Sequence, residues 1–128
     1  MAAPSRLRFH GLVAMVATRD AGRAKAFYGE TLGLTLVNED QFAVVFDARG
    51  TRLRVSIVRD LAPAKYTVLG WEVPDIVTMV NELQSAGVQF EHYGFKGQDD
   101  TGIWTAPGGA RVAWFKDPDG NVLSVTQS

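Results

Sequence analysis

The chain has 128 residues, a length that suits one domain with one shared hydrophobic core. Hydrophobic residues make up 46% and charged residues 21%, which is typical of a folded globular protein and excludes a disordered or fibrous one. Thirteen basic residues nearly balance fourteen acidic ones, so no basic field is available to hold nucleic acid or an anionic membrane surface. Cysteine is absent, which removes disulfides, thiol nucleophiles and thiolate metal ligands.

The N-terminal part of the chain carries no pattern of a membrane span or a signal peptide. No stretch approaches the roughly 20 apolar residues that a membrane-spanning helix needs. The short apolar run 11–17 follows two arginines, Arg6 and Arg8, but it leads into a charged helix rather than a cleavage site. We therefore interpret this run as a strand and expect a cytoplasmic protein.

The same order of elements recurs in the two halves of the chain, and this internal repeat is the most informative feature of the sequence. Each half begins with a predicted strand, continues with an aspartate as helix N-cap, and ends its helix at a glycine. These features are 12–17, Asp20 and Gly33 in the first half, and 67–73, Asp75 and Gly87 in the second.

After each helix the pattern predicts a short apolar strand, a β-rich strand, a tight turn and a last strand. The strands are 34–37, 42–46 and 53–58 in the first half, and 88–90, 110–115 and 122–126 in the second. The turns are 47–50 and 117–120, and the glycine that ends each one suits a positive φ. The second half also carries an extra glycine-rich stretch between Glu91 and Gly109, which we expect to form a long surface loop.

The segment from Ala26-Phe27-Tyr28 to Leu32-Gly33-Leu34 and the string Asp117-Pro118-Asp119-Gly120-Asn121 resemble the vicinal oxygen chelate superfamily. This superfamily includes glyoxalase I, bleomycin-resistance proteins, fosfomycin-resistance enzymes and extradiol dioxygenases, and the resemblance covers nearly the whole chain. It implies an α+β fold in which one domain, 1–128, holds two βαβββ modules at about 7–60 and 65–127. Their curved mixed sheets form a cup, often completed across a homodimer, so we expect a homodimer here.

The resemblance also indicates where metal ligands would lie. In the metalloenzymes of the family, four strands place His, Glu or Gln side chains in the cup. The corresponding positions in this chain are Val13, Arg54, Val68 and Ser124. Valine cannot coordinate a cation, and a guanidinium repels one. We therefore expect no family-type metal site and no cofactor, and a register slip of one residue would present other apolar side chains instead.

Strand alternation predicts which side chains line the cup. Met15 shares a face with Val13, and Glu72 shares a face with Val68. Trp104 in the glycine-rich loop suits stacking on a planar ligand, whereas Trp114 on a strand is more typical of core packing, although a tryptophan in the cup can also stack on a ligand. The predicted ligand-binding residues are Val13, Met15, Arg54, Val68, Glu72, Trp104, Trp114 and Ser124.

These features favour a metal-independent protein that binds a small organic molecule in an apolar cup. The alternative is a glyoxalase- or dioxygenase-like enzyme, in which Glu72 or His92 acts as acid or base and Arg54 stabilises an oxyanion. A metal-dependent version would need displaced ligands, drawn from Glu72, His92, Asp99 and Asp100. Arg54 is equally consistent with a solvated side chain or a pair with Glu72, and a non-catalytic interaction module is also compatible with the sequence.

Overall fold

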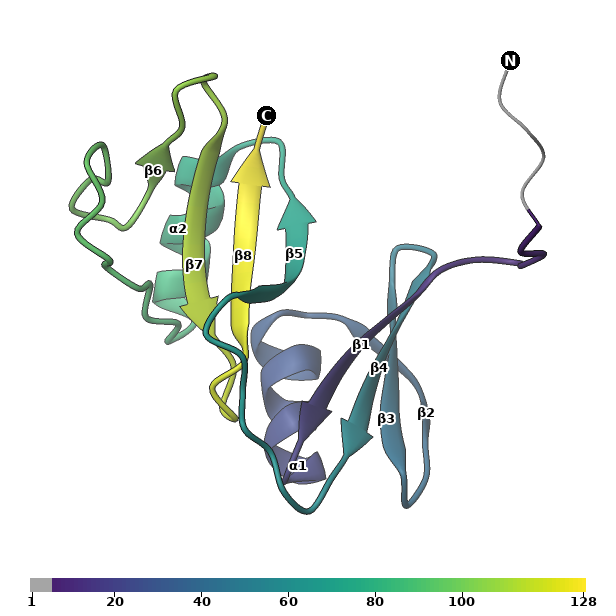
Figure 1. The fold of residues 1–128 in the computed structure, drawn as a ribbon. Coiled ribbons are helices and arrows are strands. Elements are labelled where there is room, and N and C mark those ends of the chain that lie inside the picture. Colours follow the sequence, from purple (N-terminus) through teal and green to yellow (C-terminus); the bar gives the residue numbers. More distant parts are fainter. Residues whose placement is uncertain (1–5) are drawn as a thin grey trace.

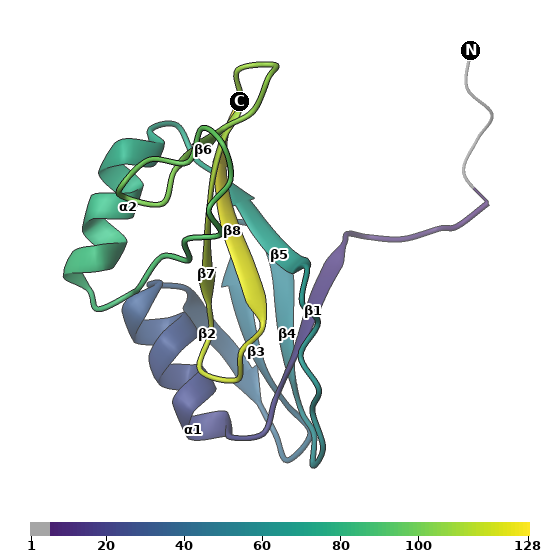
Figure 2. The same ribbon diagram turned by 60° about the vertical axis from the view of Figure 1, so that its left-hand side comes forward.

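The computed structural model describes residues 6–128 and contains two four-stranded sheets, with the helices of both halves on one side of them (Figures 1 and 2). The first half contains β1 (Val13–Thr18), α1 (Ala21–Ala24), η1 (Lys25–Thr31), β2 (Thr35–Glu39), β3 (Ala43–Ala48) and β4 (Thr51–Ile57). The second half contains β5 (Thr67–Glu72), α2 (Ile76–Ser85), β6 (Trp104–Thr105), β7 (Arg111–Lys116) and β8 (Val122–Gln127).

The two sheets have equivalent strand orders, β1-β4-β3-β2 and β5-β8-β7-β6. In each sheet the strand before the helix pairs in parallel with the last strand of its half, and the remaining pairs are antiparallel. The expected α+β fold with two mixed sheets is therefore confirmed. No helix within residues 6–128 is long and apolar enough to cross a membrane.

Both predicted helices begin and end at the expected residues. The side chain of Asp20 accepts a hydrogen bond from the backbone N–H of Arg23, and Asp75 caps Thr78 in the same way. Gly87 follows the second helix with a positive φ of 97°, a conformation that glycine adopts without a steric penalty. The first helix differs from expectation because its second part, η1, is π-helical, with the N–H of Leu32 bonded to the carbonyl of Phe27.

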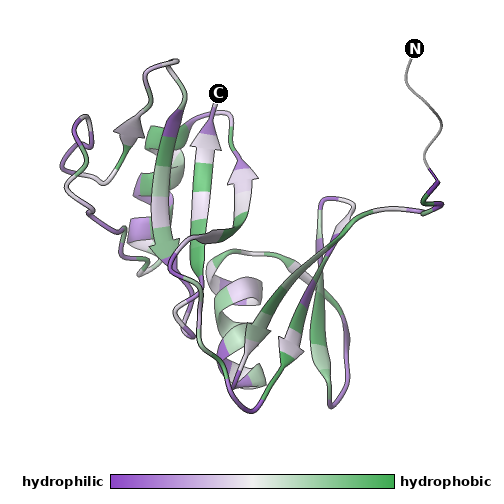
Figure 3. Cartoon of the chain, viewed as in Figure 1, coloured by the Kyte–Doolittle hydropathy of each residue, from purple (hydrophilic) through white to green (hydrophobic). Residues whose placement is uncertain are grey.

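The hydrophobic core lies between the sheets and the helices. On β1 and β4 the side chains of Val16, Leu53 and Val55 point into this core, while Val13 and Met15 alternate to the opposite side. Hydrophobic residues run along β1, β7 and β8 (Figure 3). We call the side of the two sheets that faces away from the helices the open face.

Two segments of the second half differ from the sequence prediction. Residues 88–90 form no strand, because only Phe90 makes a bridge, to Phe115. The positive φ angles of Gly94 and Gly97 then turn the chain away from a regular ladder. The stretch expected as one long loop contains β6, which places Trp104 on the edge of the sheet beside β7.

A buried polar cluster joins the two halves of the chain. The turn after β7 inserts Asp117 and Asp119 toward the first half, where Tyr28 donates a hydrogen bond to Asp117 at 2.7 Å. Thr18 donates its hydroxyl hydrogen to the carboxylate of Asp119, which also accepts the backbone N–H of Arg19 at 3.0 Å. These charge-assisted contacts fix the second sheet against η1 and β1, and so set how the two sheets lie side by side on the open face.

Candidate functional site

Apolar side chains occupy much of the open face at the junction of the two sheets. Val13 is 53% exposed and Met15 is 59% exposed, and both belong to β1. Val68 on β5 is exposed on the same side, and β1 and β5 contact each other along the junction. Exposed apolar side chains that lie together on one face are typical of a surface that binds a ligand or a partner.

Four aromatic rings gather on the open face of the second sheet, and we call them the aromatic cluster: Tyr93, Phe95, Trp104 and Trp114. Trp114 is at its centre, with ring centroids 5.5 Å from Tyr93, 5.8 Å from Phe95 and 6.0 Å from Trp104. Tyr93 and Phe95 come from the glycine-rich segment, which folds back over β7. Their rings remain nearly half exposed, so the cluster presents aromatic surface to solvent.

Two cavities border the aromatic cluster. One has a volume of about 300 Å³ and is lined by Tyr93, Phe95 and Trp114 together with Lys65 and Tyr66. The other has a volume of about 410 Å³ and shares Lys65 and Tyr93 with the first. These volumes fall within the range of small-molecule sites. The arrangement offers flat rings for stacking and a concave wall beside them.

The charged groups around these cavities are mainly cationic. Lys65 is exposed and lines both cavities, while Lys116 lines one and forms an ion pair with Glu91 at 3.2 Å. Burial raises the pKa of the Tyr93 hydroxyl, and the negative charge of Glu91 adds to this effect. Tyr93 is therefore a neutral hydrogen-bonding group at the cavity edge near pH 7.

The predicted residues of the first sheet lie on the open face but apart from the aromatic cluster. Arg54 sits in the middle of its sheet, between Met15 on β1 and Val45 on β3. Ser124, on the second sheet, is only 7% exposed and lies between Gly70 and Trp114 of the neighbouring strands. Ser124 therefore presents little surface to a ligand.

The acid–base candidates are not brought together. Glu72 accepts a hydrogen bond from the Ser128 hydroxyl at 2.8 Å and is exposed at the end of β5. No ion pair joins Glu72 to Arg54 within residues 6–128. His92 is exposed and lies near Gly102, on the far edge of the second sheet. The structure thus offers no adjacent acid, base and oxyanion-stabilising group among these residues.

The residues of this chain do not fit the metal centre that the family's enzymes use. Among residues 6–128, no group of three or more His, Cys, Asp or Glu side chains lies close enough to hold a metal ion. The open face carries Val13 and Val68 on the strands where ligands would be needed. Glu72, His92, Asp99 and Asp100 do not converge either, so the displaced-ligand alternative has no supporting geometry.

Comparison with known families decides the assignment of the chain. The model of the Glyoxalase/Bleomycin resistance protein/Dioxygenase superfamily matches residues 11–125. The chain belongs to this superfamily. The match agrees with the resemblance expected from the two sequence strings and with the paired sheets of the structure.

Solved structures of this superfamily share the fold at low sequence identity. A superfamily member from Sphaerobacter thermophilus is 24% identical with a TM-score of 0.75, and the match covers 94% of this chain and 98% of that one. Lactoylglutathione lyase from Agrobacterium tumefaciens is 17% identical with a TM-score of 0.72, covering 98% of this chain and 96% of that one. These likenesses establish the fold alone. Comparison with curated proteins finds no match.

Sequence reasoning found part of the aromatic cluster and missed the rest. The sequence favours Trp104 for stacking and core packing for Trp114, and both rings belong to the cluster. The sequence does not predict Tyr93 and Phe95 as members, because it indicates a loop there and no strand that would orient their side chains. No local pattern indicates that they share a face, because Gly94 between them has a positive φ of 74° and strand alternation does not apply across it.

Proposed function

We propose that this protein binds a planar small organic molecule on its open face, without a metal ion. The aromatic cluster is the observation that carries this proposal. Four rings gather beside two cavities, and flat aromatic surface that remains exposed favours stacking with a planar ligand. Lys65 at the cavity wall favours a ligand that also carries an acidic or acceptor group.

The lack of converging metal donors supports a binding role over the enzymatic alternative. Members of the superfamily that use a metal need several oxygen or nitrogen ligands held together. Here the strands offer Val13, Val68 and the cation Arg54 in those places, and the candidates Glu72 and His92 lie apart. A ligand would therefore be retained by stacking, apolar contact and hydrogen bonds rather than by chelation.

The exposed apolar residues of the first sheet support a homodimer. Val13 and Met15 are large apolar side chains that a monomer leaves in water. We propose that a second copy covers this part of the open face. Sedimentation velocity tests the proposal with Met15→Glu, which would put a charge in the contact and should shift the protein to monomer. A wild-type protein that sediments as a monomer at high concentration contradicts it.

Binding can be located by NMR with 2-naphthoate as a planar anionic probe. The indole N–H signals of Trp71, Trp104 and Trp114 would be assigned by single tryptophan-to-phenylalanine substitutions. The probe should shift the signals of Trp104 and Trp114 in a saturable way, and Trp114→Leu should weaken its binding about twofold to tenfold, given the usual energy of aromatic stacking. Phe42→Leu removes an exposed aromatic ring elsewhere and is the matched control. Shifts confined to Trp71, or none at all, contradict the proposal.

A further inference from the structure

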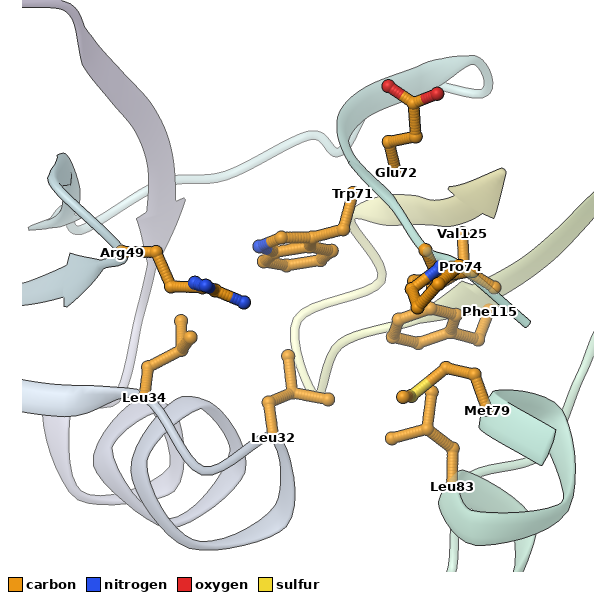
Figure 4. A pocket seen from close by; sticks show the side chains of 11 residues that line it. Leu32, Leu34, Arg49, Trp71, Glu72, Pro74, Met79, Leu83, Phe115 and Val125 are labelled. Atoms are coloured by element: carbon orange, nitrogen blue, oxygen red, sulfur yellow. The ribbon is translucent and has the colours of Figure 1, made fainter. Parts of the chain in front are cut away.

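Another cavity lies on the helix side of the molecule, between the two halves of the chain. It has a volume of about 310 Å³ and opens between the end of the first helix and α2 (Figure 4). Leu32 and Leu34 line it from the first half, and Met79 and Leu83 line it from the second. We call it the inter-sheet cavity. Its wall is almost wholly aliphatic and aromatic, which suits the apolar body of a ligand.

The indole of Trp71 forms one wall of the inter-sheet cavity and separates it from the open face. Trp71 is half-buried on β5, and its side chain projects toward the helices while Val68 and Gly70 face the other way. A ligand in this cavity would therefore contact Trp71 and would not touch the aromatic cluster. This inference is thus independent of the function proposed for the open face.

Arg49 places a cation at the mouth of the inter-sheet cavity. Its side chain extends from the turn between β3 and β4 into the opening between Leu34 and Trp71 (Figure 4). Within residues 6–128 its guanidinium makes no ion pair and no hydrogen bond. Glu72 also lines the cavity, but its carboxylate points outward and accepts the hydroxyl of Ser128 instead.

The backbone at Arg49 is strained, so the presence of an arginine at this position indicates a role for its side chain. Arg49 and Gly50 have φ angles of 53° and 97°, so both lie in the left-handed region that a tight hairpin turn requires. Glycine or asparagine fits this position with less strain, and other L-residues there cost about 1–2 kcal/mol. The arginine supplies what glycine and asparagine lack, which is a long cationic side chain that reaches the cavity.

We propose that the inter-sheet cavity binds a small amphipathic anion, with its apolar body among Leu32, Met79 and Leu83 and its carboxylate at Arg49. Charge complementarity selects the class, because the free guanidinium at the mouth favours a carboxylate over a neutral or cationic head group. The apolar wall selects a compact hydrocarbon or phenyl body. Arg49 is the specificity-determining residue of this site.

NMR titration with 4-phenylbutyrate and its uncharged counterpart, 4-phenylbutan-1-ol, tests this proposal. The indole N–H of Trp71 should shift saturably with 4-phenylbutyrate, with a dissociation constant independent of any shift at Trp104 and Trp114. Arg49→Gly preserves the left-handed turn, so the protein should fold, and it should weaken binding of the acid about threefold to tenfold without changing that of the alcohol. Arg59→Gln removes an exposed arginine that does not line the cavity, so it is the control and should change neither.

Three results would overturn the proposal. The first is the absence of any saturable shift at Trp71. The second is equal binding of the acid and the alcohol in the wild-type protein, and the third is an unchanged affinity for the acid in Arg49→Gly. Because the open-face site is read at Trp104 and Trp114, failure of one site leaves the result for the other site intact.

Discussion

The hydroxyl of Tyr28 donates a hydrogen bond to the carboxylate of Asp117 across 89 positions of sequence, at a distance of 2.7 Å. Tyr28 belongs to the first helix, and Asp117 begins the turn between the last two strands. Both side chains are buried, and Asp117 also accepts hydrogen bonds from the backbone and side chain of Asn121. The two strings that resemble the superfamily thus meet in one contact, which explains why they occur together.

Removing the hydroxyl should destabilise the protein. Tyr28→Phe keeps the ring and its contacts but deprives the buried carboxylate of one donor, which should lower the free energy of unfolding by about 1–3 kcal/mol. Urea denaturation at pH 7 measures this change. Tyr66→Phe removes an exposed hydroxyl and should change stability by less than about 0.5 kcal/mol. Equal effects of the two substitutions would contradict a structural role of the Tyr28 hydroxyl.

The same hydroxyl should make stability fall in alkaline solution. Burial is the main reason that the pKa of Tyr28 is raised above its ordinary value of 10.0, and the charge of Asp117 adds to it. The folded protein therefore keeps a proton that the unfolded chain loses, so this contribution is complete below pH 10 and declines above it. The stability gap between wild type and Tyr28→Phe should narrow by about 1.4 kcal/mol per pH unit above that point. Urea denaturation from pH 8 to 11 checks this, and a constant gap would disprove it.

Gly70 and Ser124 should be energetically coupled. A Cβ at Gly70 would lie 2.6 Å from the Oγ of Ser124, which is buried on the neighbouring strand. Gly70→Ala should therefore cost about 1 kcal/mol in the wild-type background. In Ser124→Ala the obstructing oxygen is gone, and the same change should be neutral or stabilising. A double-mutant cycle by chemical denaturation measures the coupling, and strictly additive effects would show that no clash exists.

Metal analysis tests whether side chains on the open face can hold a metal ion. Purified untagged protein, incubated with manganese, nickel, zinc or iron(II) and then desalted, should retain far less than one equivalent by mass spectrometry. The reason is that no three potential ligands converge within residues 6–128. Retention of near-stoichiometric metal by the wild type would show that the side chains rearrange into a site. His92→Ala and Glu72→Ala would then identify the ligands.

The fold could be predicted from local signals because those signals coincide with the caps and turns. Asp20, Asp75 and the two tight turns are each recognisable from a few neighbouring residues, and each performs the expected task. Alternation along β1 and β5 also placed Val13 and Val68 on the correct side of their sheets. Where one face of a strand is buried, the alternation of apolar residues fixes the register of that strand. The sequence alone then predicts on which face a residue of the strand lies.

Features that depend on tertiary contacts could not be predicted in this way. The direction of Tyr93 and Phe95 depends on how an irregular segment folds back over Trp114. The placement of Arg49 beside Trp71 depends on how the two sheets meet, which no local pattern encodes. Sequence reasoning therefore identified two members of the aromatic cluster and did not anticipate the inter-sheet cavity.

Metal-independent binding of a planar ligand is the central claim, and isothermal titration of 2-naphthoate in the presence of a chelator tests it most directly. We predict saturable binding with EDTA present, unchanged when manganese or zinc replaces the chelator, and about twofold to tenfold weaker in Trp114→Leu. Binding that appears only when a divalent metal ion is added, or that is identical in Trp114→Leu, would contradict the claim.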